Sequence, residues 1–356
     1  MSGMSQPAVS LILTVKDEAA SLPELLASIA AQSRPPDEVI VVDGGSCDAT
    51  VTILRQWAER LPLTVIELPG ASIAEGRNAA LEQARGELVA VTDAGVILEP
   101  DWLERLIEPF LAPEREQPDV VSGFFRAAPR TLFELALGVT TLPDVEEIRE
   151  ERFLPSSRSV AFRRSWFLAG IRYPGWLDYC EDVVFDLRLR RAGARFRFQP
   201  AAIAWFRPRR TLAEFWRQYY RYARGDGKAG LFTTRHLIRY ATYLGLVPAV
   251  LLTRDRRLAL LAGLGALAYL RRPLWRLWRR REVGPRRLVV AALLVPLIRL
   301  VGDLAKMAGY PAGLAWRARR YGLRRTWRSI PEPVSLGRAG EPAAGVQAGG
   351  TPLPRD

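Results

Sequence analysis

The sequence predicts an α/β protein in which helices flank a mostly parallel sheet, with apolar helices following at the C-terminal end. Short β-branched runs alternate with helical patterns over the first 125 residues. These runs are apolar throughout, which is typical of parallel strands covered on both faces and joined by right-handed crossovers. The last third of the chain combines apolar stretches with many arginines. With 356 residues, of which 49% are hydrophobic, the chain is long enough to bury a substantial core.

Five apolar runs in the first part of the chain are the expected strands, at residues 10–15, 39–43, 63–67, 87–93 and 119–125. Helices are expected between them, at about 21–32, 48–60, 74–85 and 100–111. Ser21 and Glu24 have the spacing of a capping box, and Asp48 is a candidate N-cap. Further elements are expected as a strand near 158–163, a helix at 181–192, short strands in RFRFQP and AAIAWF, and an amphipathic helix at about 211–224.

Charge divides the chain into an acidic and a basic part. Residues 1–206 hold 21 Lys and Arg against 30 Asp and Glu, whereas residues 207–330 hold 28 against 5. In the basic part arginines alternate with apolar runs and tryptophans, which favours an anionic membrane over nucleic acid as the partner. We therefore expect an α/β domain at 1–230, a basic, membrane-associated helical region at 231–330 and a disordered tail at 331–356.

Three apolar stretches are candidates for membrane contact, at residues 237–253, 258–270 and 288–298 with a weak continuation to about 316. Each is shorter than a typical spanning helix, and buried helices of a soluble domain are one alternative. Their basic, tryptophan-rich flanks favour a membrane boundary instead. Keeping both basic blocks in the cytoplasm predicts a hairpin of the first two stretches, with the third lying in the interface. A wholly interfacial attachment is the other alternative, because arginines occupy the hairpin turn at Arg254, Arg256 and Arg257.

Composition excludes several kinds of site. The two cysteines, Cys47 and Cys180, cannot form a disulfide framework or a cysteine-rich zinc site. The single histidine, His236, argues against His-based triads and multi-histidine metal sites. Neither GxGxxG after the first strand nor GxxxxGK[ST] is present, so a dinucleotide site or a P-loop is not expected. The first residues lack the features of a signal peptide, so we expect the N-terminal part to stay in the cytoplasm.

Polar residues follow three of the expected strands, in the segments 14–18, 43–46 and 92–95. Because ligands of open parallel sheets bind outside the carboxyl ends of the strands, we expect these segments to line one crevice. Asp43 can accept hydrogen bonds from a base or a ribose, and Asp93 is the candidate to hold a divalent cation that bridges phosphate oxygens. Arg77 can place its guanidinium against a diphosphate, with a surface cation as the alternative.

Two later segments carry further candidates. Glu181 and Asp182 begin an expected helix after an irregular loop, where a general base can be presented to an acceptor hydroxyl. The helix dipole alone also favours acids at that position. The segment FWRQYYRYARGDGKAG is rich in arginine and tyrosine. It can close over a diphosphate or line an acceptor groove, and a basic amphipathic helix near a membrane is the alternative interpretation.

Together these motifs resemble the inverting family-2 glycosyltransferases, which have a GT-A fold, over about residues 9–227. The resemblance is carried by VSLILTVKDEAASLPELLASIAAQSRPPDEVIVVDGGSCDAT, GRNAALEQARGELVAVTDAG, AFRRSWFLAGIRYPGWLDYCEDVVFDLRLRRAG and RQYYRY. It implies a Rossmann-like sheet that binds a nucleotide-diphosphate sugar, with the nucleobase and ribose near Thr14, Lys16 and Asp43. It also implies Arg77 near the diphosphate, Asp93 at the DxD metal position, Asp182 as the catalytic base, and a QxxRW-like motif at Gln218, Arg221 and Tyr222.

Two positions depart from the family pattern. Asp93-Ala94-Gly95 lacks the second carboxylate of the DxD motif, and Trp205 and Phe206 follow the late strand where relatives often have a histidine. The resemblance therefore implies a loosely held Mg²⁺ or Mn²⁺, coordinated by Asp93, donor phosphates and water. A metal-independent enzyme, in which arginines take over the electrostatic role of the metal, is the alternative.

The expected function is transfer of a sugar, with inversion, to a hydroxyl of a lipid-linked or glycan acceptor at the cell membrane, as in the assembly of cell-envelope glycans. The catalytic domain is expected on the cytoplasmic side. The alternatives are a nucleotidyltransferase and a non-catalytic membrane scaffold that keeps the fold without the metal site. Nucleic acid is not an expected partner. The sequence does not distinguish the addition of one sugar from the addition of many.

Overall fold

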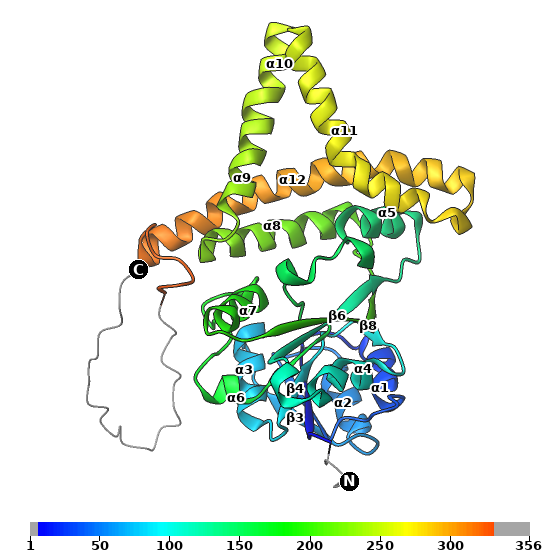
Figure 1. The fold of residues 1–356 in the computed structure, drawn as a ribbon, viewed down its shortest axis with the longest axis vertical. Helices are drawn as coiled ribbons and strands as arrows, with labels where there is room; N and C mark the ends of the chain where they lie inside the picture. The colour runs from blue at the N-terminus through cyan, green and yellow to red at the C-terminus, as the bar shows by residue number, and fades with distance from the viewer. Residues whose placement is uncertain (1–5, 331–356) are drawn as a thin grey trace.

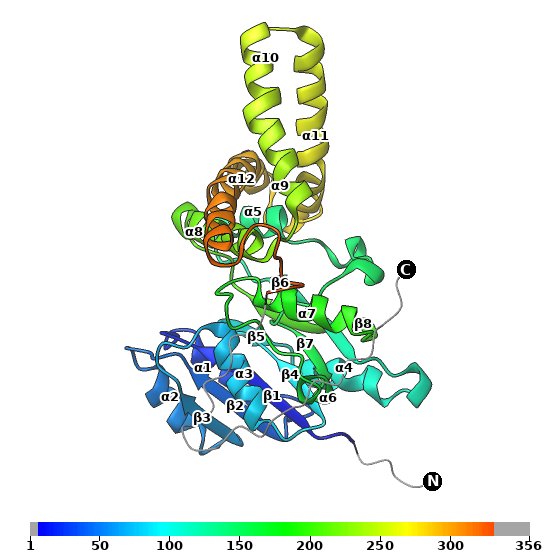
Figure 2. The same cartoon turned by 90° about the vertical axis from the view of Figure 1, so that its left-hand side faces the viewer.

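The computed structural model describes residues 6–330, which form a layered α/β part and a helical part beside it (Figures 1 and 2). The expected disordered tail at 331–356 lies outside the described residues. The sheet has the order β3-β2-β1-β4-β7-β6-β8-β5. Its strands are β1 (Val9–Val15), β2 (Glu38–Asp43), β3 (Leu63–Glu67), β4 (Leu88–Val91), β5 (Val96–Leu98), β6 (Val120–Ala127), β7 (Val160–Arg163) and β8 (Phe196–Phe206).

The prediction of a parallel sheet holds for the four strands at one end. β3, β2, β1 and β4 are parallel neighbours, and their apolar runs are those that the sequence predicted. Beyond β4 the sheet is mixed, because β7 runs antiparallel to both β4 and β6. β8 is parallel to β6, and β5 pairs antiparallel with β8. The two short strands expected between residues 195 and 206 are in fact the single long strand β8.

The helices around the sheet fall near their predicted positions. They are α1 (Leu22–Ala30), α2 (Thr50–Trp57), α3 (Ile73–Gln83), α4 (Trp102–Ile107), α5 (Leu132–Thr141), α6 (Ser165–Leu168) and α7 (Glu181–Arg191). Short 3₁₀ turns are η1 (Glu108–Leu111), η2 (Glu114–Glu116), η3 (Val145–Glu147), η4 (Glu150–Arg152) and η6 (Arg281–Val283). One hydrophobic cluster, which includes Trp102, and a second, which includes Phe162 and Phe185, form the core on the two sides of the sheet.

Local capping differs from the prediction at α1. Ser21 makes no side-chain cap bond, and its hydroxyl contacts Glu18 instead, so the capping box expected from Ser21 and Glu24 does not form. The box forms ahead of α3, where Ser72 and Glu75 exchange both hydrogen bonds. That box matters for the site because it fixes the first turn of α3, and Arg77 follows directly after that turn.

The expected fourth strand at 87–93 is shorter than predicted, and a short strand that was not predicted follows it. β4 ends at Val91 and β5 begins at Val96, so residues 92–95 form a turn between them. Gly95 has a φ of 75°, a left-handed conformation that glycine adopts at little cost. The turn displays Asp93 at the edge of the sheet rather than within a strand.

The C-terminal helices form a long pair and a projecting hairpin (Figures 1 and 2). They are α8 (Leu212–Ala229), α9 (Thr233–Tyr240), the π-helical η5 (Ala241–Leu246), α10 (Val247–Thr253), α11 (Arg256–Trp278) and α12 (Pro285–Tyr321). The predicted hairpin is present, since α9 to α10 rises from α8 and α11 returns beside it. The third apolar stretch is longer than expected and is part of the 37-residue helix α12.

The hairpin is not buried against the rest of the protein. Only 6% of the apolar window in Thr233–Thr253 is buried, and leucines on α10 and α11 are largely exposed, for example Leu252 at 83% and Leu260 at 65%. Thr233–Thr253 and Pro285–Tyr321 are both long and apolar enough to cross a membrane. Exposed apolar surface of this extent is typical of a membrane or protein contact.

Small residues allow α8 and α12 to approach each other closely. A Cβ atom on Gly313 would lie 2.1 Å from the carbonyl oxygen of Arg224, and one on Gly309 would lie 2.2 Å from that of Tyr220. On α8, a Cβ atom on Gly227 would lie 2.4 Å from the carbonyl oxygen of Tyr310. Glycines at such spacings let helix backbones pack directly against each other. The position of α8 therefore depends on α12.

We expect Gly313→Ala to destabilise the protein by about 1–3 kcal/mol, because the new methyl group meets a backbone carbonyl that cannot rotate away. Gly263→Ala in α11 is the matched control, since nothing lies within 4 Å of its Cβ position. That control should be neutral or slightly stabilising, as alanine favours a helix over glycine. Melting temperatures of the full chain in detergent would test this, and equal melting of the two variants would contradict it.

Candidate active site

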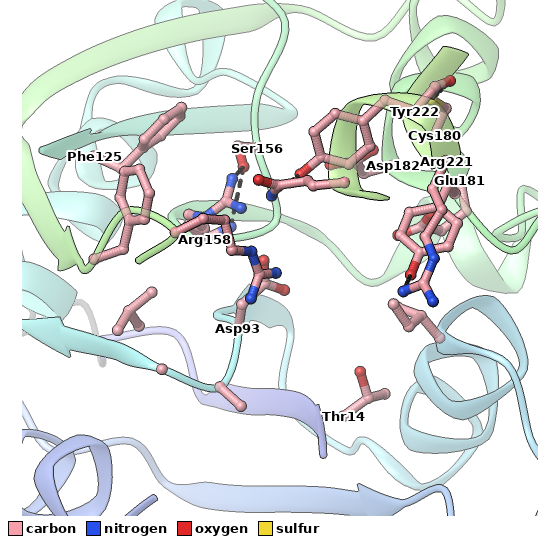
Figure 3. A pocket seen from close by; sticks show the side chains of 18 of the residues that line it. Thr14, Asp93, Phe125, Ser156, Arg158, Cys180, Glu181, Asp182, Arg221 and Tyr222 are labelled. Carbon is pink, nitrogen blue, oxygen red and sulfur yellow. Dashed lines mark hydrogen bonds between the residues drawn. The ribbon is translucent and has the colours of Figure 1, made fainter. Parts of the chain in front are cut away.

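One cavity of about 1600 Å³ lies at the carboxyl ends of the central strands and extends beneath α8 (Figure 3). It is lined by nine of the ten predicted site residues, namely Thr14, Lys16, Arg77, Asp93, Glu181, Asp182, Gln218, Arg221 and Tyr222. These residues come from β1, α3, the β4–β5 turn, α7 and α8. The structure thus brings together five separate segments of the sequence.

Arg77 joins two of these segments directly. Its side chain is 3% exposed, and its two terminal nitrogens donate to Glu181 Oε1 and to Asp93 Oδ1, each at 2.7 Å. The guanidinium also lies 5.3 Å from the ring centroid of Tyr173. A buried charge needs such partners because its desolvation is costly. Arg77 was predicted as a diphosphate ligand, and in this structure it is the bridge between two carboxylates.

Glu181 and Asp182 occupy the first turn of α7, directly after a strained residue. Cys180 has φ 65° and ψ 19°, a left-handed conformation that turns the chain sharply into the helix. Glu181 is 6% exposed, whereas Asp182 is partly exposed and accepts a hydrogen bond from the backbone N–H of Val183 at 2.8 Å. Burial, and then the Asp182 carboxylate, raises the pKa of Glu181 to about 7, with Arg77 opposing the shift. Asp182 is thus the more accessible carboxylate of the pair.

Arg158 is a site residue that the sequence analysis missed. It precedes β7, and its guanidinium lies 5.4 Å from the Phe125 ring and 5.0 Å from the Phe206 ring (Figure 3). Burial would lower the pKa of Arg158, but Tyr222 and Asp93 raise it above its usual value. The sequence signal was weak, because a lone arginine at the start of an expected strand has no distinguishing neighbours.

α8 presents one face to the cavity. Gln218 Nε2 donates to the Tyr222 hydroxyl at 2.8 Å, and Arg221 donates to the Tyr179 hydroxyl at 2.8 Å. The helix is held against the segment that leads into α7, since Lys228 contacts Asp178 at 2.6 Å. A Cβ atom on Gly225 would lie 2.6 Å from the Tyr179 carbonyl oxygen. α8 therefore fixes the loop that positions Glu181 and Asp182.

Asp43 is the one predicted site residue that does not line the cavity. It is 2% exposed, and its Oδ2 accepts hydrogen bonds from the backbone N–H groups of Gly45 and Ser46, each at 3.0 Å. Its carboxylate thus organises the loop after β2. Next to it, Asp17 Oδ1 accepts from the Cys47 N–H at 2.7 Å and ties the β1 and β2 loops together. Contact of Asp43 with a ribose stays a prediction.

The carboxylates of the site suit a cation that is shared with a phosphate. Among residues 6–330, no cluster of three or more His, Cys, Asp and Glu side chains could hold a metal alone. Asp93 is 29% exposed, and one of its oxygens is engaged by Arg77. Mg²⁺ and related ions are commonly held by one or two carboxylates together with substrate phosphates and water. Asp93 fits that arrangement as the single protein ligand.

Comparison with known proteins agrees with this geometry. Residues 10–167 match the family model described as Glycosyl transferase family 2. The chain is 27% identical over 240 residues to "Probable glycosyltransferase YdaM" of Bacillus subtilis (strain 168), covering 62% of this chain and 55% of that protein. It is 30% identical over 118 residues to beta-monoglucosyldiacylglycerol synthase of Synechocystis sp., and the match covers 32% of this chain and 25% of that protein. This chain spans about half the length of YdaM.

Among solved structures, the mannosyltransferase PcManGT from Pyrobaculum calidifontis, in complex with GDP-Man and Mn²⁺, is similar in fold. It has a TM-score of 0.53 and 20% identity, with 89% of this chain and 88% of that chain covered. The fold is therefore that of the GT-A glycosyltransferases. Residues 10–167, somewhat less than half of the chain, are similar to glycosyltransferase family 2. Glu181, Asp182 and α8 lie outside the matched residues 10–167, so their assignment to the site comes from the geometry described above.

The raised pKa of Glu181 predicts a pH dependence of stability. Because the folded-state value of about 7 lies above the ordinary 4.5, the folded protein holds this proton more tightly than the unfolded chain does. The resulting stabilisation is complete below about pH 4.5 and is lost as the pH rises through about 7. Glu181→Gln keeps an acceptor for Arg77 and should flatten this decline. Melting temperatures measured between pH 4.5 and 8 would test this pH dependence. The exposed Glu59→Gln is the control variant. If the melting temperatures of wild type and Glu181→Gln fell in parallel as the pH rises, the prediction would be wrong.

Proposed function

We propose that this protein transfers a sugar from a nucleoside-diphosphate sugar to an acceptor hydroxyl, with inversion, at the surface of a membrane. The observation that carries the proposal is the convergence of Asp93, Arg77 and the Glu181–Asp182 pair in one cavity. The family of the matched domain and the carboxyl-end location of the cavity support a nucleotide-sugar donor. PcManGT, of similar fold, was solved with GDP-Man and Mn²⁺.

In the proposed donor site, Thr14 and Lys16 at the end of β1 contact the nucleoside. Asp93 would hold Mg²⁺ or Mn²⁺ together with the diphosphate, and such an ion would supply positive charge for the leaving group. Arg158 and Arg221 line the same cavity and supply further positive charge for the diphosphate. Arg77 holds the Asp93 carboxylate in place through its hydrogen bond to Oδ1.

In the proposed reaction, Asp182 accepts the proton of the acceptor hydroxyl, and that oxygen forms a bond to the anomeric carbon. The bond between the anomeric carbon and the diphosphate oxygen breaks in the same displacement, and the nucleoside diphosphate leaves. Attack from the side opposite the leaving group inverts the anomeric configuration. Asp182 suits the role because it is partly exposed in the cavity, whereas Glu181 is buried and engaged by Arg77.

The proposed acceptor is lipid-linked, or a glycan at the membrane. The exposed apolar hairpin of α9 to α11 and the two candidate spanning helices support membrane attachment of residues 231–330 beside a catalytic domain at 1–230. A similar protein is named for glucosylation of a diacylglycerol. The basic residues near the hairpin suit an anionic, cytoplasmic membrane face and assembly of cell-envelope glycans there.

Asp182→Asn should lower kcat for sugar transfer by about 10²–10⁴, as loss of a general base does, with little change in donor binding. Asp101→Asn, at a side chain that is 45% exposed and pairs with Arg105 on α4, is the matched control and should keep wild-type turnover. Nucleotide sugars would first be screened for release of nucleoside diphosphate by the full chain. Near-wild-type transfer by Asp182→Asn would remove it as the base. Release of pyrophosphate would indicate a nucleotidyltransferase, and no turnover with any donor would indicate a scaffold.

A further inference from the structure

The turn that leads into Glu181 and Asp182 is held by contacts with α8. Cys180 has a left-handed backbone conformation, which costs a non-glycine residue free energy unless its surroundings fix it. Its thiol lies 3.4 Å from the Tyr222 carbonyl oxygen (Figure 3). The same thiol lies 3.6 Å from Asp226 Oδ1. α8 therefore stabilises this turn through both its backbone and a side chain.

Backbone packing fixes the same turn to α8. A Cβ atom on Gly225 would lie 2.6 Å from the Tyr179 carbonyl oxygen and 3.0 Å from Cys180 Sγ. The turn thus rests directly on the helix backbone next to Asp226. A shift of α8 at this point would move Cys180 and, with it, the two carboxylates that follow.

The only histidine of the chain binds the other oxygen of Asp226. His236 is 2% exposed, and its Nε2 lies 3.0 Å from Asp226 Oδ2. Its Nδ1 lies 3.3 Å from a terminal nitrogen of Arg239. The ring also stacks on Tyr310, with 3.8 Å between the ring centroids. Asp226 thus contacts the Cys180 turn with one oxygen and α9 with the other.

The partners of His236 determine which of its nitrogens carries the proton. A guanidinium has only donors, so Arg239 donates this hydrogen bond and Nδ1 accepts it. The proton of the neutral imidazole is then on Nε2, which donates it to Asp226 Oδ2. Arg239 also binds Asp303 of α12 at 2.7 Å. The polar contacts therefore form a continuous set from α12 through α9 and α8 to the turn.

We propose that His236 is a positioning residue for Asp182, and that it acts through Asp226 and the Cys180 turn. The hydrogen bond from Nε2 holds the last turn of α8 in the place where the helix supports the left-handed Cys180. Without that bond the end of α8 shifts, and the Asp182 carboxylate shifts with the turn. This inference rests on the proposed function, in which Asp182 is the base, and adds a residue outside the reacting groups.

Two substitutions separate the hydrogen bonds of His236 from its packing. His236→Phe keeps a planar ring for the stack on Tyr310 but has no donor or acceptor in its side chain. His236→Gln loses the ring but places an acceptor and a donor on one carbon, as the imidazole does. Tyr310→Phe is the matched control, since it keeps the stack and removes only the hydroxyl contact with Thr233 at 3.0 Å.

The first measurement is kcat and KM of the full chain in detergent micelles, for the nucleotide sugar that the screen with Asp182→Asn identifies. His236→Phe should lower kcat by about 10- to 100-fold with an unchanged KM for the donor. Displacement of a reacting group by about 1 Å is known to cost up to about 10²-fold in rate. His236→Gln should recover most of the wild-type kcat, and Tyr310→Phe should retain it.

The second measurement does not depend on turnover. In a Cys47→Ser background Cys180 is the single thiol of the chain, so its reaction with iodoacetamide reports how firmly the turn is held. Burial raises the pKa of the Cys180 thiol, which slows the reaction while the turn is closed. His236→Phe should speed labelling about tenfold, since a hydrogen bond to a charged group contributes about that factor. His236→Gln and Tyr310→Phe should label at the wild-type rate.

Three results would overturn the positioning role. Wild-type kcat in His236→Phe would show that the hydrogen bonds do not matter for Asp182, even if labelling rises. An equal loss of kcat in His236→Gln would assign the effect to the packing of the ring. A raised KM with an unchanged kcat would assign His236 to substrate contact. If His236→Phe does not fold, Asp226→Leu removes the same bond from the α8 side and should give the same two results.

Labelling also separates this inference from the proposed function. If no sample turns over a donor, wild type included, but labelling of Cys180 depends on His236 as expected, the proposed function is wrong and the hold on the turn stands. If the wild type turns over a donor and every His236 variant matches it in kcat and labelling, the proposed function stands and the positioning role is wrong.

Discussion

The buried guanidinium of Arg77 is the interaction on which the site depends. It holds Asp93 at the sheet edge and Glu181 at the start of α7, each at 2.7 Å. Removal of one partner from a buried ion pair typically costs about 3–5 kcal/mol, because the remaining charge loses its compensation. Burial raises the pKa of Glu181 even with Arg77 beside it, as expected when a carboxylate is taken out of water.

The same connection continues into the helical part of the molecule. Asp178, just before α7, is held by Arg224 and Lys228 of α8, and α8 packs on α12 through glycines. From α8, Asp226 contacts His236 of α9, and Arg239 one turn later is paired with Asp303 of α12. The hairpin is thus attached to the catalytic cavity by a chain of polar contacts. A membrane that holds the hairpin would therefore also set the orientation of Asp182.

The sequence was most informative where a single physical rule acts. Apolar runs predicted β1 to β4, and the carboxyl-end rule predicted that Thr14, Lys16 and Asp93 would line one crevice, and all three line the cavity. It was least informative where long-range packing decides. The antiparallel β7, the bridging position of Arg77 and the inward position of Arg158 depend on segments that meet only after folding. The loop N–H groups that bind the Asp43 carboxylate could not be predicted from the sequence either, and its contact with a ribose stays a prediction.

A structure of the full chain determined with its nucleotide-sugar donor and Mn²⁺ would test the central claim most directly. The account predicts a metal bound to Asp93 and the donor diphosphate, with Arg77 still joining Asp93 to Glu181 behind it. The Asp182 carboxylate should face the anomeric carbon from the side opposite the diphosphate. A donor bound away from Asp93, or with its anomeric carbon turned away from Asp182, would contradict the account.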